Sequence, residues 1–409
     1  MKTTNHILAT AIATLFIAPA AFATNGTNMT GVGAQAVALG GTGVAAYYGA
    51  ENVIINPAMI GKSTGTEFTF GGTLFKPSVS NDGLFGDTVN KANSAADTNV
   101  IPSIALSSRI NSNLSFGIGA FGTSGMGVDY NGATGANGAL LKAQTSLQIM
   151  RFVPTLAYNT ANAGVGASAI VQYGALDINY DTAGTPFAAA GKIGSGMSSD
   201  LGYGFSLGGY YDLSKQFTLG ASYTSAINMK YKNQLSVASA PFVGLIPAAF
   251  GDNLEQPAEI KAGAAYTMGN IMLTGDLKQI RWSEAKGYKD FGWQDQNVIA
   301  LGLKYMGTGY WVGVGYNKAD NPIKAQNGLT SAGAVTNMFN NIFFPATTDQ
   351  HFSVGGGYDL TKSVSLEGSV MYAPSVTTTI ETTGLGFGAS TNTTSQSQLA
   401  YTVQAKYKF

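Results

Sequence analysis

The chain ends in Leu399–Phe409, LAYTVQAKYKF, in which apolar and polar side chains alternate up to the last residue. A period of two is that of a β-strand, whose successive side chains point to opposite faces. A strand of a transmembrane barrel alternates in this way between lipid and a polar lumen. The edge strand of a soluble sheet can do the same, but it rarely ends flush with the chain. One face would hold Leu399, Tyr401, Val403, Ala405, Tyr407 and Phe409, and the other Ala400, Thr402, Gln404, Lys406 and Lys408.

The composition of the 409 residues also favours a membrane wall. Charged residues make up 11% of the chain, against about 25% in a typical soluble domain. A soluble protein with so little charge would expose apolar area and aggregate. In lipid, only helices and closed barrels satisfy every backbone amide. No apolar run of about 18 residues, the length of a spanning helix, follows residue 23, so an all-β barrel remains.

The alternation recurs along the chain and predicts a transmembrane antiparallel β-barrel of 14 strands. Many of the alternating stretches end on Tyr or Phe, as expected for aromatic girdles at the lipid–water boundary. An even number of strands is usual in single-chain bacterial barrels. The expected strands are residues 66–76, 100–108, 114–122, 149–159, 164–178, 200–213, 216–231, 258–267, 270–282, 295–306, 309–317, 350–360, 363–373 and 398–409.

Connection lengths agree with this barrel, because such barrels alternate short periplasmic turns with longer outer loops. Short turns are expected around Asn111–Asn113 and Gly307–Gly309, among others, and the longest connection runs from about Asn317 to Asp349. This order places both ends of the barrel, residues 63–409, in the periplasm. The terminal Phe409 resembles the sorting signature of outer-membrane barrels, so we expect the barrel assembly machinery to recognise it.

The N-terminal residues direct the chain to export. Lys2, the apolar stretch Ile7–Ile17 and the small-residue site Ala21–Ala23 make up a signal peptide of residues 1–23. An uncleaved anchor is the alternative, but the apolar stretch is short for one. Residues 24–62 lack the strand period and are too apolar for a solvated periplasmic tail, which is the other interpretation. We expect them to plug the lumen as a hatch.

The mature chain offers little for nucleic-acid binding, metal binding or catalysis. Without Lys2, the Lys plus Arg count falls from 22 to 21 against 22 Asp plus Glu, so no basic surface attracts nucleic acid. His351 is the sole imidazole after the signal peptide. With Asp349 nearby, the sequence leaves a Ser-His-Asp triad open, but a His at a strand boundary without chemistry is the simpler interpretation. No His or carboxylate cluster has metal-ligand spacing, so we expect no cofactor and no enzyme.

Several segments resemble the outer-membrane fatty acid and hydrocarbon transporters of the FadL/TodX type, over nearly the whole mature chain. In the plug, Gly33, Ala36, Gly40–Gly41 and Ala45 lead to Asn56-Pro57-Ala58, the signature of that family's hatch. Asn-Pro-Ala alone is a weak signal, but the set in this order and spacing is specific. The similar barrel segments are Gly125–Tyr130, Arg151–Tyr158, Gln256-Pro257-Ala258, Trp282-Ser283, Trp293–Tyr305, Tyr316–Pro322 and Phe344–Tyr358.

The resemblance implies a monomer that takes up hydrophobic small molecules, either long-chain fatty acids or hydrocarbons. Apolar grooves in the outer loops would capture the ligand, the hatch would rearrange, and a kinked third strand would let the ligand leave sideways through the wall. Gly117, Gly119 and Gly122 are the candidates for that kink, because Gly weakens a strand and favours bulges. Packing of these glycines against the hatch is an equal alternative.

Two exterior loops, Gly122–Gln148 and Pro241–Phe250, are unusually apolar, and the family places ligand contacts in the first. Ordinary loop packing is the alternative. A fatty acid would also need a basic partner for its carboxylate, and Arg151 and Lys304 are the candidates, although neither aligns with the family's anchor. A hydrocarbon substrate therefore stays open. The candidate ligand-binding residues are Met126, Val128, Tyr130, Leu140, Leu141, Phe242, Leu245 and Ile246.

Two other functions share the strand pattern: a general porin for polar solutes, and a structural or adhesive barrel. An open porin has no need for an apolar, Gly-rich segment before its first strand, so the hatch argues against the first. In either case the wall would contact outer-membrane lipid and lipopolysaccharide.

Overall fold

The computed structural model describes residues 24–84, 86, 91–133, 141–182 and 191–409. The expected signal peptide of residues 1–23 lies outside this range. None of the helices in the described part combines the length and apolarity needed to cross a membrane.

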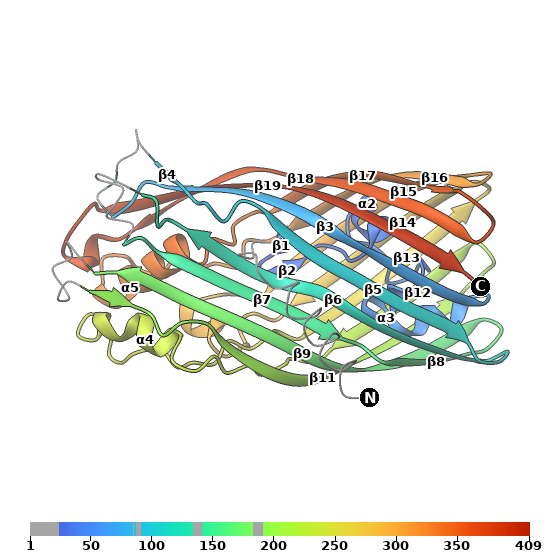
Figure 1. Cartoon of the computed structure of the whole chain (residues 1–409), viewed down its shortest axis with the longest axis horizontal. Coiled ribbons are helices and arrows are strands. Elements are labelled where there is room, and N and C mark those ends of the chain that lie inside the picture. The colour runs from blue at the N-terminus through green and yellow to red at the C-terminus, as the bar shows by residue number, and fades with distance from the viewer. Residues whose placement is uncertain (1–23, 85, 87–90, 134–140, 183–190) are drawn as a thin grey trace, which may run out of the picture.

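Fourteen antiparallel segments of the wall, here called staves, form one closed barrel, as the alternation predicts (Figure 1). A stave is one strand, or two consecutive strands in line, that crosses the wall once. The barrel closes where β19 pairs with β3, for example at Tyr401 and Leu74. Strands β7 and β8 together make the fourth stave, because both pair with β6 and with β9. The staves are β3 (Thr66–Asn81), β5 (Asn99–Arg109), β6 (Leu114–Asp129), β7 (Gln144–Phe152) with β8 (Thr155–Asn159), β9 (Ala163–Asp181), β11 (Ser198–Asp212), β12 (Phe217–Thr224), β13 (Glu259–Met268), β14 (Ile271–Ile280), β15 (Gln296–Gly307), β16 (Tyr310–Ala319), β17 (Gln350–Asp359), β18 (Val364–Glu381) and β19 (Thr391–Lys408).

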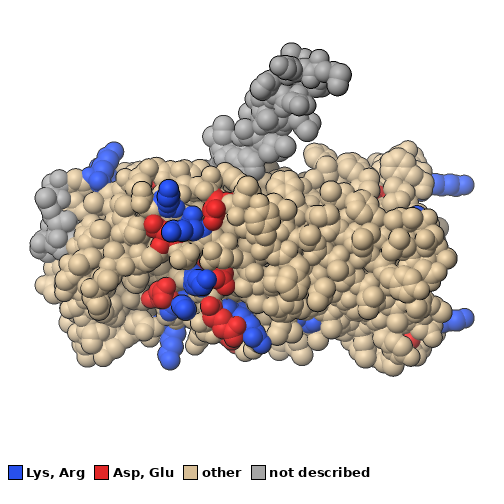
Figure 2. Space-filling view, turned by 90° about the horizontal axis from the view of Figure 1, so that it is seen from below, with Lys and Arg blue, Asp and Glu red and all other residues tan. Residues whose placement is uncertain are grey.

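Side chains alternate between the outer wall and the lumen along each stave. In β15, Leu301 and Leu303 are 52% and 44% exposed on the outside, whereas Ala300 and Lys304 are buried. This is the pattern expected when lipid replaces water around the wall. On the face shown in Figure 2, charged side chains gather mainly in one band and leave a long stretch of wall without them.

The two ends of the barrel differ. At one end, here called the turn end, short connections such as those between β11 and β12 and between β15 and β16 join the staves. At the other, the loop end, long connections carry α4 (Leu235–Ser239), α5 (Ser331–Met338) and the short elements η4 (Ala240–Phe242), η5 (Tyr288–Phe291), η6 (Phe339–Phe343) and η7 (Thr383–Leu385), together with β4 (Ala92–Asn93) and β10 (Lys192–Ile193). Figure 1 shows the chain's C-terminus at the turn end and α4 and α5 at the loop end.

The expected strand over residues 216–231 is wrong beyond Thr224. There the chain leaves the wall and makes isolated bridges, Ile227 with Gln256 and Lys230 with Asn253. Ile227, Met229 and Tyr231 are fully buried among the loops, so their alternation reflects a loop core and not a lipid face. Conversely, β18 and β19 extend toward the loop end beyond the expected residues 363–373 and 398–409.

Residues 24–62 occupy the lumen. They form β1 (Thr24–Asn25), β2 (Asn28–Met29), α2 (Ala34–Ala38), α3 (Asn52–Ile55) and the 3-10 helix η2 (Pro57–Lys62). Helix α2 packs against β16 to β19, and η2 packs against β6, β8, β9 and β11 on the other side. Glycines in the wall permit this approach: a Cβ on Gly315 would lie 2.0 Å from the amide nitrogen of Gly40.

Candidate functional site

The barrel wall has a seam between β5 and β6. Their ladder runs from Arg109 opposite Ser115 to Ser103 opposite Phe121 and ends there. Farther toward the loop end, the edge of β6 pairs with β2 of the hatch instead, at Asn28 opposite Ser124.

The hatch fills this seam through both backbone and side-chain bonds. The amide of Gly125 donates to the carbonyl of Thr27 at 3.0 Å, and the hydroxyls of Thr27 and Ser124 lie 2.9 Å apart. Beyond the seam, β6 is joined again to the wall, because the amide of Ala95 donates to the carbonyl of Asp129. The seam is therefore a bounded interruption of the β5–β6 ladder, here called the window, and β2 of the hatch pairs with its β6 edge.

The third and fourth staves are irregular beside the window. The register between β6 and β7 shifts between Gly122 and Ser124, and the fourth stave is interrupted at Val153 and Pro154, between β7 and β8. Proline cannot donate to a ladder, which accounts for the interruption.

The three candidate kink glycines have different neighbours. A Cβ on Gly117 would lie 2.5 Å from Val53 of the hatch, whereas one on Gly122 would lie 2.5 Å from Ile101 of β5. A Cβ on Gly119 would lie 2.3 Å from the ring of Phe121. Gly117 thus packs against the hatch, and Gly122 lies at the register shift.

Apolar residues from six connections at the loop end form part of one core. Of the candidate ligand-binding residues, six are buried in this core: Met126, Val128, Tyr130, Leu141, Phe242 and Ile246. Leu245 packs partly buried against it, and Leu140 lies outside the described residues.

Sequence reasoning missed most of the aromatic residues in this core. Trp282, Tyr288 and Trp293 form a cluster with ring centroids 4.6 to 4.9 Å apart. The ring of Phe339 lies 5.3 Å from Phe242 and 5.9 Å from Phe250. The signal was available, because Trp282 and Trp293 stand in a single connection, between β14 and β15, in which charged and polar residues are frequent.

A charged cavity of about 70 Å³ lies between the hatch and the wall. The hatch contributes Asn28 to Val32, Ala36, Gly41, Val44, Ile54 and Ile55 to its lining, and the wall contributes the candidate anchor Arg151. Three basic and two acidic side chains from β7, β13 and β14 line it: Arg151, Lys261, Lys278, Glu259 and Asp276.

Both carboxylates in this cavity are engaged. Glu259 accepts from Asn28 Nδ2 at 2.9 Å and forms an ion pair with Lys261 at 2.9 Å. Asp276 accepts from the backbone amides of Gly43 and Val44 at 2.8 and 3.0 Å. Arg151 uses Nε to donate to Gln172 at 2.9 Å. Lys278 makes no hydrogen bond to any described residue, so positive charge is left over for an anion.

The other candidate anchor, Lys304, lies elsewhere. Its ammonium donates to Gln35 of α2 at 2.7 Å and stands 5.2 Å from the ring centre of Trp311. Gln35 in turn donates to Glu367 at 3.0 Å. The structure therefore does not bring Arg151 and Lys304 together: Lys304 holds the hatch, whereas Arg151 faces the cavity.

The hatch motif fixes the end of the plug to the wall. Asn56 Nδ2 donates to the carbonyls of Val44 at 2.6 Å and Gly209 at 3.1 Å, while its Oδ1 accepts from the amide of Ala58 at 3.1 Å. Asn56 thus caps η2, and Pro57 takes the first helical position, where its missing N–H costs nothing.

His351 is buried at the start of β17. It makes no hydrogen bond to a serine or a carboxylate among the described residues, and Asp349 is paired with Lys318. The Ser-His-Asp arrangement that the sequence left open is therefore not assembled in this part of the chain. The described residues also contain no group of three His, Cys, Asp or Glu able to hold a metal ion.

Comparisons with known proteins agree with this architecture. The model of a family described as "Outer membrane protein transport protein (OMPP1/FadL/TodX)" matches residues 9–409. The toluene transporter TodX of Pseudomonas putida is 18% identical, with a TM-score of 0.67, over 93% of this chain and 99% of that one. A FadL homologue of Pseudomonas aeruginosa is 14% identical, with a TM-score of 0.70, over 94% and 100% of the two chains.

Two further relatives extend the comparison. The toluene transporter TbuX of Ralstonia pickettii is 16% identical, with a TM-score of 0.64, over 93% of this chain and 99% of that one. A Chlorobium limicola protein, named only as uncharacterized and encoded in the 5' region of the phosphoenolpyruvate carboxykinase gene, is 43% identical over 76 residues, which are 18% of this chain and 37% of that relative. The match thus spans little more than a third of that relative's length.

Proposed function

Because the chain belongs to the OMPP1/FadL/TodX family of outer-membrane transport proteins, we propose that it carries long-chain fatty acids or hydrocarbons across the Gram-negative outer membrane. Apolar compounds cross the saccharide-covered outer leaflet slowly, and a water-filled pore gives them no affinity. An apolar core at the loop end does give affinity. The similar structures named above include transporters of toluene and a homologue of FadL, which motivates both substrate classes.

Capture takes place in the aromatic core of the outer loops. Met126 near the end of β6 and Tyr130 just after that strand meet there with Phe242 and Phe339, which come from two other connections. Each CH₂ group moved from water into such a core contributes about 0.8 kcal/mol, so a chain of ten carbons gains roughly 8 kcal/mol. Binding of that strength needs a second conformation with lower affinity to let the ligand go.

Exit takes place through the window between β5 and β6, and the observation that supports this step is the pairing of β2 with the β6 edge of that window. β2 stands in the window as a removable strand, tied to β6 at Asn28 and Ser124. When ligand fills the lumen, β2 moves and the ligand passes sideways into the membrane. The register of β6 against β7 shifts between Gly122 and Ser124, next to the end of the β5–β6 ladder, and this irregularity of the third stave supports an exit at this height.

The charged cavity next to β2 is the place for a carboxylate. Asn28 lines both the cavity and the window, so a headgroup bound by Arg151 and Lys278 competes with the contacts that hold β2. Glu259 now accepts from Asn28, and an arriving carboxylate repels Glu259 and weakens that bond. Headgroup binding and hatch movement are thereby linked. For a hydrocarbon, the same window works without this step.

A disulfide between β2 and β6 tests the mechanism. Asn28 and Ser124 are directly opposed antiparallel partners, whose Cα atoms are typically about 4.5 to 5.5 Å apart, within the range of about 4.4 to 6.8 Å that a disulfide bridges. The chain contains no other Cys. In Asn28→Cys with Ser124→Cys, uptake of a radiolabelled fatty acid by cells should stop under oxidising conditions and return with reductant.

The matched control links two wall strands and leaves the hatch free. Thr73 and Thr402 are opposed partners of β3 and β19 inside the barrel, so the Thr73→Cys, Thr402→Cys disulfide should not affect uptake. Undiminished uptake by the oxidised Asn28→Cys, Ser124→Cys variant would contradict exit through the window. Large steady conductance of the wild type in a planar bilayer would favour the porin alternative, and normal growth of a deletion strain on hydrophobic carbon sources would favour an adhesive barrel.

A further inference from the structure

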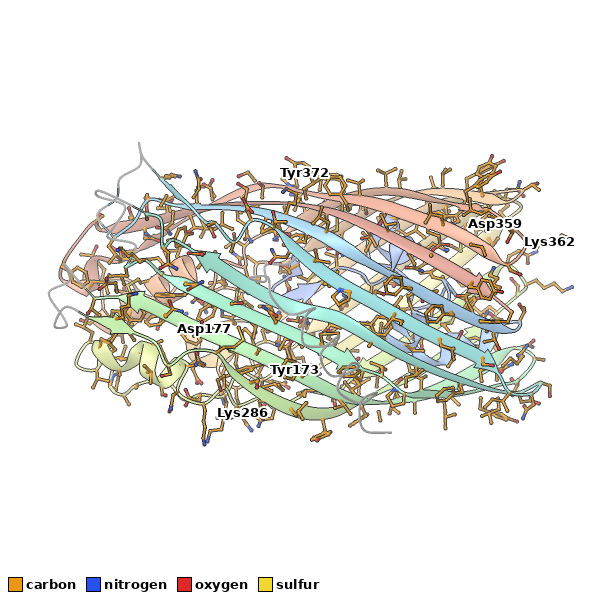
Figure 3. The ribbon with its side chains drawn as sticks, viewed as in Figure 1. Tyr173, Asp177, Lys286, Asp359, Lys362 and Tyr372 are labelled. Atoms are coloured by element: carbon orange, nitrogen blue, oxygen red, sulfur yellow. The ribbon has the colours of Figure 1, made fainter. Side chains whose placement is uncertain are left out.

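One row of outward-facing residues, about midway along β18, marks the change from an apolar wall to a polar one toward the loop end. Tyr372 of β18 is paired with Leu399 of β19, and Leu399 is paired with Lys76 of β3. Toward the turn end, the same face carries Leu74 and Tyr401, both about 40% exposed. Tyr and Lys are the side chains that anchor a protein at a lipid–water interface. The row therefore has the composition of a lipid–water interface on the side of the loop end; Figure 3 labels its member Tyr372.

Beyond this row the three strands present hydroxyl groups. The Oγ atoms of Thr377 and Ser395 lie 2.9 Å apart, and those of Thr379 and Thr393 lie 3.1 Å apart. Ser80 of β3 stands next to Ser395 in the same sheet. We call these side chains the hydroxyl ladder. Lys91 borders it, with Nζ 3.4 Å from Ser395 Oγ.

A hollow of about 460 Å³ crosses the boundary row on the outside of the wall. Its lining includes Lys76, Asp97, Tyr372 and Leu399. Lys76 Nζ donates to Thr98 Oγ1 at 3.1 Å, and that hydroxyl donates to Asp97 at 2.9 Å. An ammonium has three donors, so Lys76 keeps donors for a ligand. The hollow thus combines an apolar floor, a cation and a carboxylate that accepts hydrogen bonds.

We propose that this face binds lipopolysaccharide. Its phosphate meets Lys76, its sugars lie over the hydroxyl ladder, and its acyl chains run along Tyr372 and Leu399 toward the turn end. A free phosphate fits less well, because Asp97 would repel it, whereas sugar hydroxyls donate to that carboxylate. A phospholipid supplies phosphate and acyl chains but little to match the hydroxyls of Thr377 and Thr379. The hollow is continuous with the lipid-facing wall, so the ligand needs no separate route to it.

The test uses the full-length barrel in detergent and three probes: rough lipopolysaccharide, phosphatidylglycerol vesicles and inorganic phosphate. Lys76→Glu should weaken binding of lipopolysaccharide about fivefold or more, since one surface lysine contributes about 1 kcal/mol toward an anionic lipid. Lys362→Glu is the matched control, because Lys362 is an exposed lysine in the turn between β17 and β18, at the other end of the barrel. It should leave binding unchanged.

A second variant addresses the sugars without changing charge. Thr377→Val with Thr379→Val keeps the branched shape that favours strands and removes two ladder hydroxyls, so binding of lipopolysaccharide should weaken while heat stability is retained. Equal binding by the wild type and Lys76→Glu overturns the proposal. The proposal is also overturned if phosphatidylglycerol or inorganic phosphate stabilises the wild type as much as lipopolysaccharide does. This face would then not distinguish a glycolipid from another phosphate-bearing ligand.

Discussion

The side-chain amide of Gln404 in β19 donates a hydrogen bond to the carboxylate of Glu51 at the start of α3. This bond joins the wall to the hatch inside a buried group of charges. Lys406 Nζ lies 3.2 Å from Glu367 and 4.0 Å from Glu67, and it donates to the carbonyl of Tyr48 at 2.7 Å. Gln35 and Trp311 donate to Glu367 from α2 and β16. The carboxylates of Glu51, Glu67 and Glu367 thus share one close lysine, Lys406. Lys304 is linked to this group only through Gln35.

This group predicts that hatch docking depends on pH. Burial raises the pKa of Glu51 from its ordinary value of 4.5 to about 7; Lys406 opposes the rise, and Glu367 and Glu67 add to it. A carboxyl whose pKa is higher in the docked hatch than in the undocked hatch stabilises docking fully at a pH below its undocked pKa. This stabilisation is lost as the pH rises through its docked pKa. Between about pH 4.5 and 7, docking should weaken by up to about 3 kcal/mol.

Glu51→Gln should remove most of that dependence, because the amide stays neutral at every pH. Limited proteolysis of the hatch in purified protein, followed from about pH 5 to about pH 8, should show protection falling in the wild type and constant in the variant. Glu284→Gln, at an exposed loop site, is the control and should follow the wild type. Parallel curves for the wild type and Glu51→Gln would mean that another group sets the dependence.

Close approach of hatch and wall predicts a steric effect at Gly315. A Cβ there would lie 2.0 Å from the amide nitrogen of Gly40 and 2.8 Å from the carbonyl oxygen of Ala38. Both are backbone atoms, so Gly315→Ala should displace the hatch at a cost of about 1 to 3 kcal/mol. Ion conductance in a planar bilayer should rise, because the plug no longer seals.

The control for this prediction is Gly275→Ala in β14. A Cβ at Gly275 would lie no nearer than 3.4 Å to any neighbour, so its conductance should stay at the wild-type level. If Gly315→Ala also conducts like the wild type, the hatch does not depend on close contact with β16.

A third prediction concerns Asn56 of the hatch motif. Its amide nitrogen donates to the carbonyl of Val44 in a buried bond and to that of Gly209 in a partly buried one. Asn56→Ala leaves both carbonyls unsatisfied, at about 1 to 3 kcal/mol for each. Asn56→Asp has the same shape but no donor, so it should be no better than Asn56→Ala. The proteolysis assay above measures both, and rescue by Asn56→Asp would contradict this account.

The sequence predicted the barrel well because lipid enforces a strict alternation. Each of the fourteen expected strands overlaps a stave, down to the closing strand at Phe409. The predicted strand boundaries were wrong where the wall no longer faces lipid. At the loop end, β18 and β19 continue through Thr377–Glu381 and Thr391–Thr394, where Thr residues predominate on both faces and leave no period to detect.

The site was harder to predict, because height along the barrel is not encoded in a strand's own pattern. Arg151 and Lys304 both face the lumen, yet one lines the cavity and the other holds α2. The group around Lys406 was missed entirely, although Glu67, Glu367 and Lys406 are buried on the inward face of β3, β18 and β19. Charged residues at inward positions of neighbouring strands were a signal that pairing could have revealed.

A last prediction separates the two substrate classes through Arg151. If Arg151 holds a carboxylate in the charged cavity, Arg151→Gln should weaken binding of a fatty acid about tenfold, which corresponds to about 1.4 kcal/mol and to the loss of one charge-assisted hydrogen bond. Binding of an uncharged hydrocarbon such as toluene should not change. Fluorescence titration of purified protein with a labelled fatty acid, and competition by each ligand, measure the two affinities.

Lys304→Gln is the matched control for this comparison. Its ammonium is engaged by Gln35 and Trp311 at the hatch, so removing it should loosen the hatch without a preference between acid and hydrocarbon. If Arg151→Gln weakens binding of the fatty acid and of the hydrocarbon equally, Arg151 acts on the cavity as a whole and not on a carboxylate. Selective loss in Lys304→Gln would instead move the headgroup to the α2 side of the lumen.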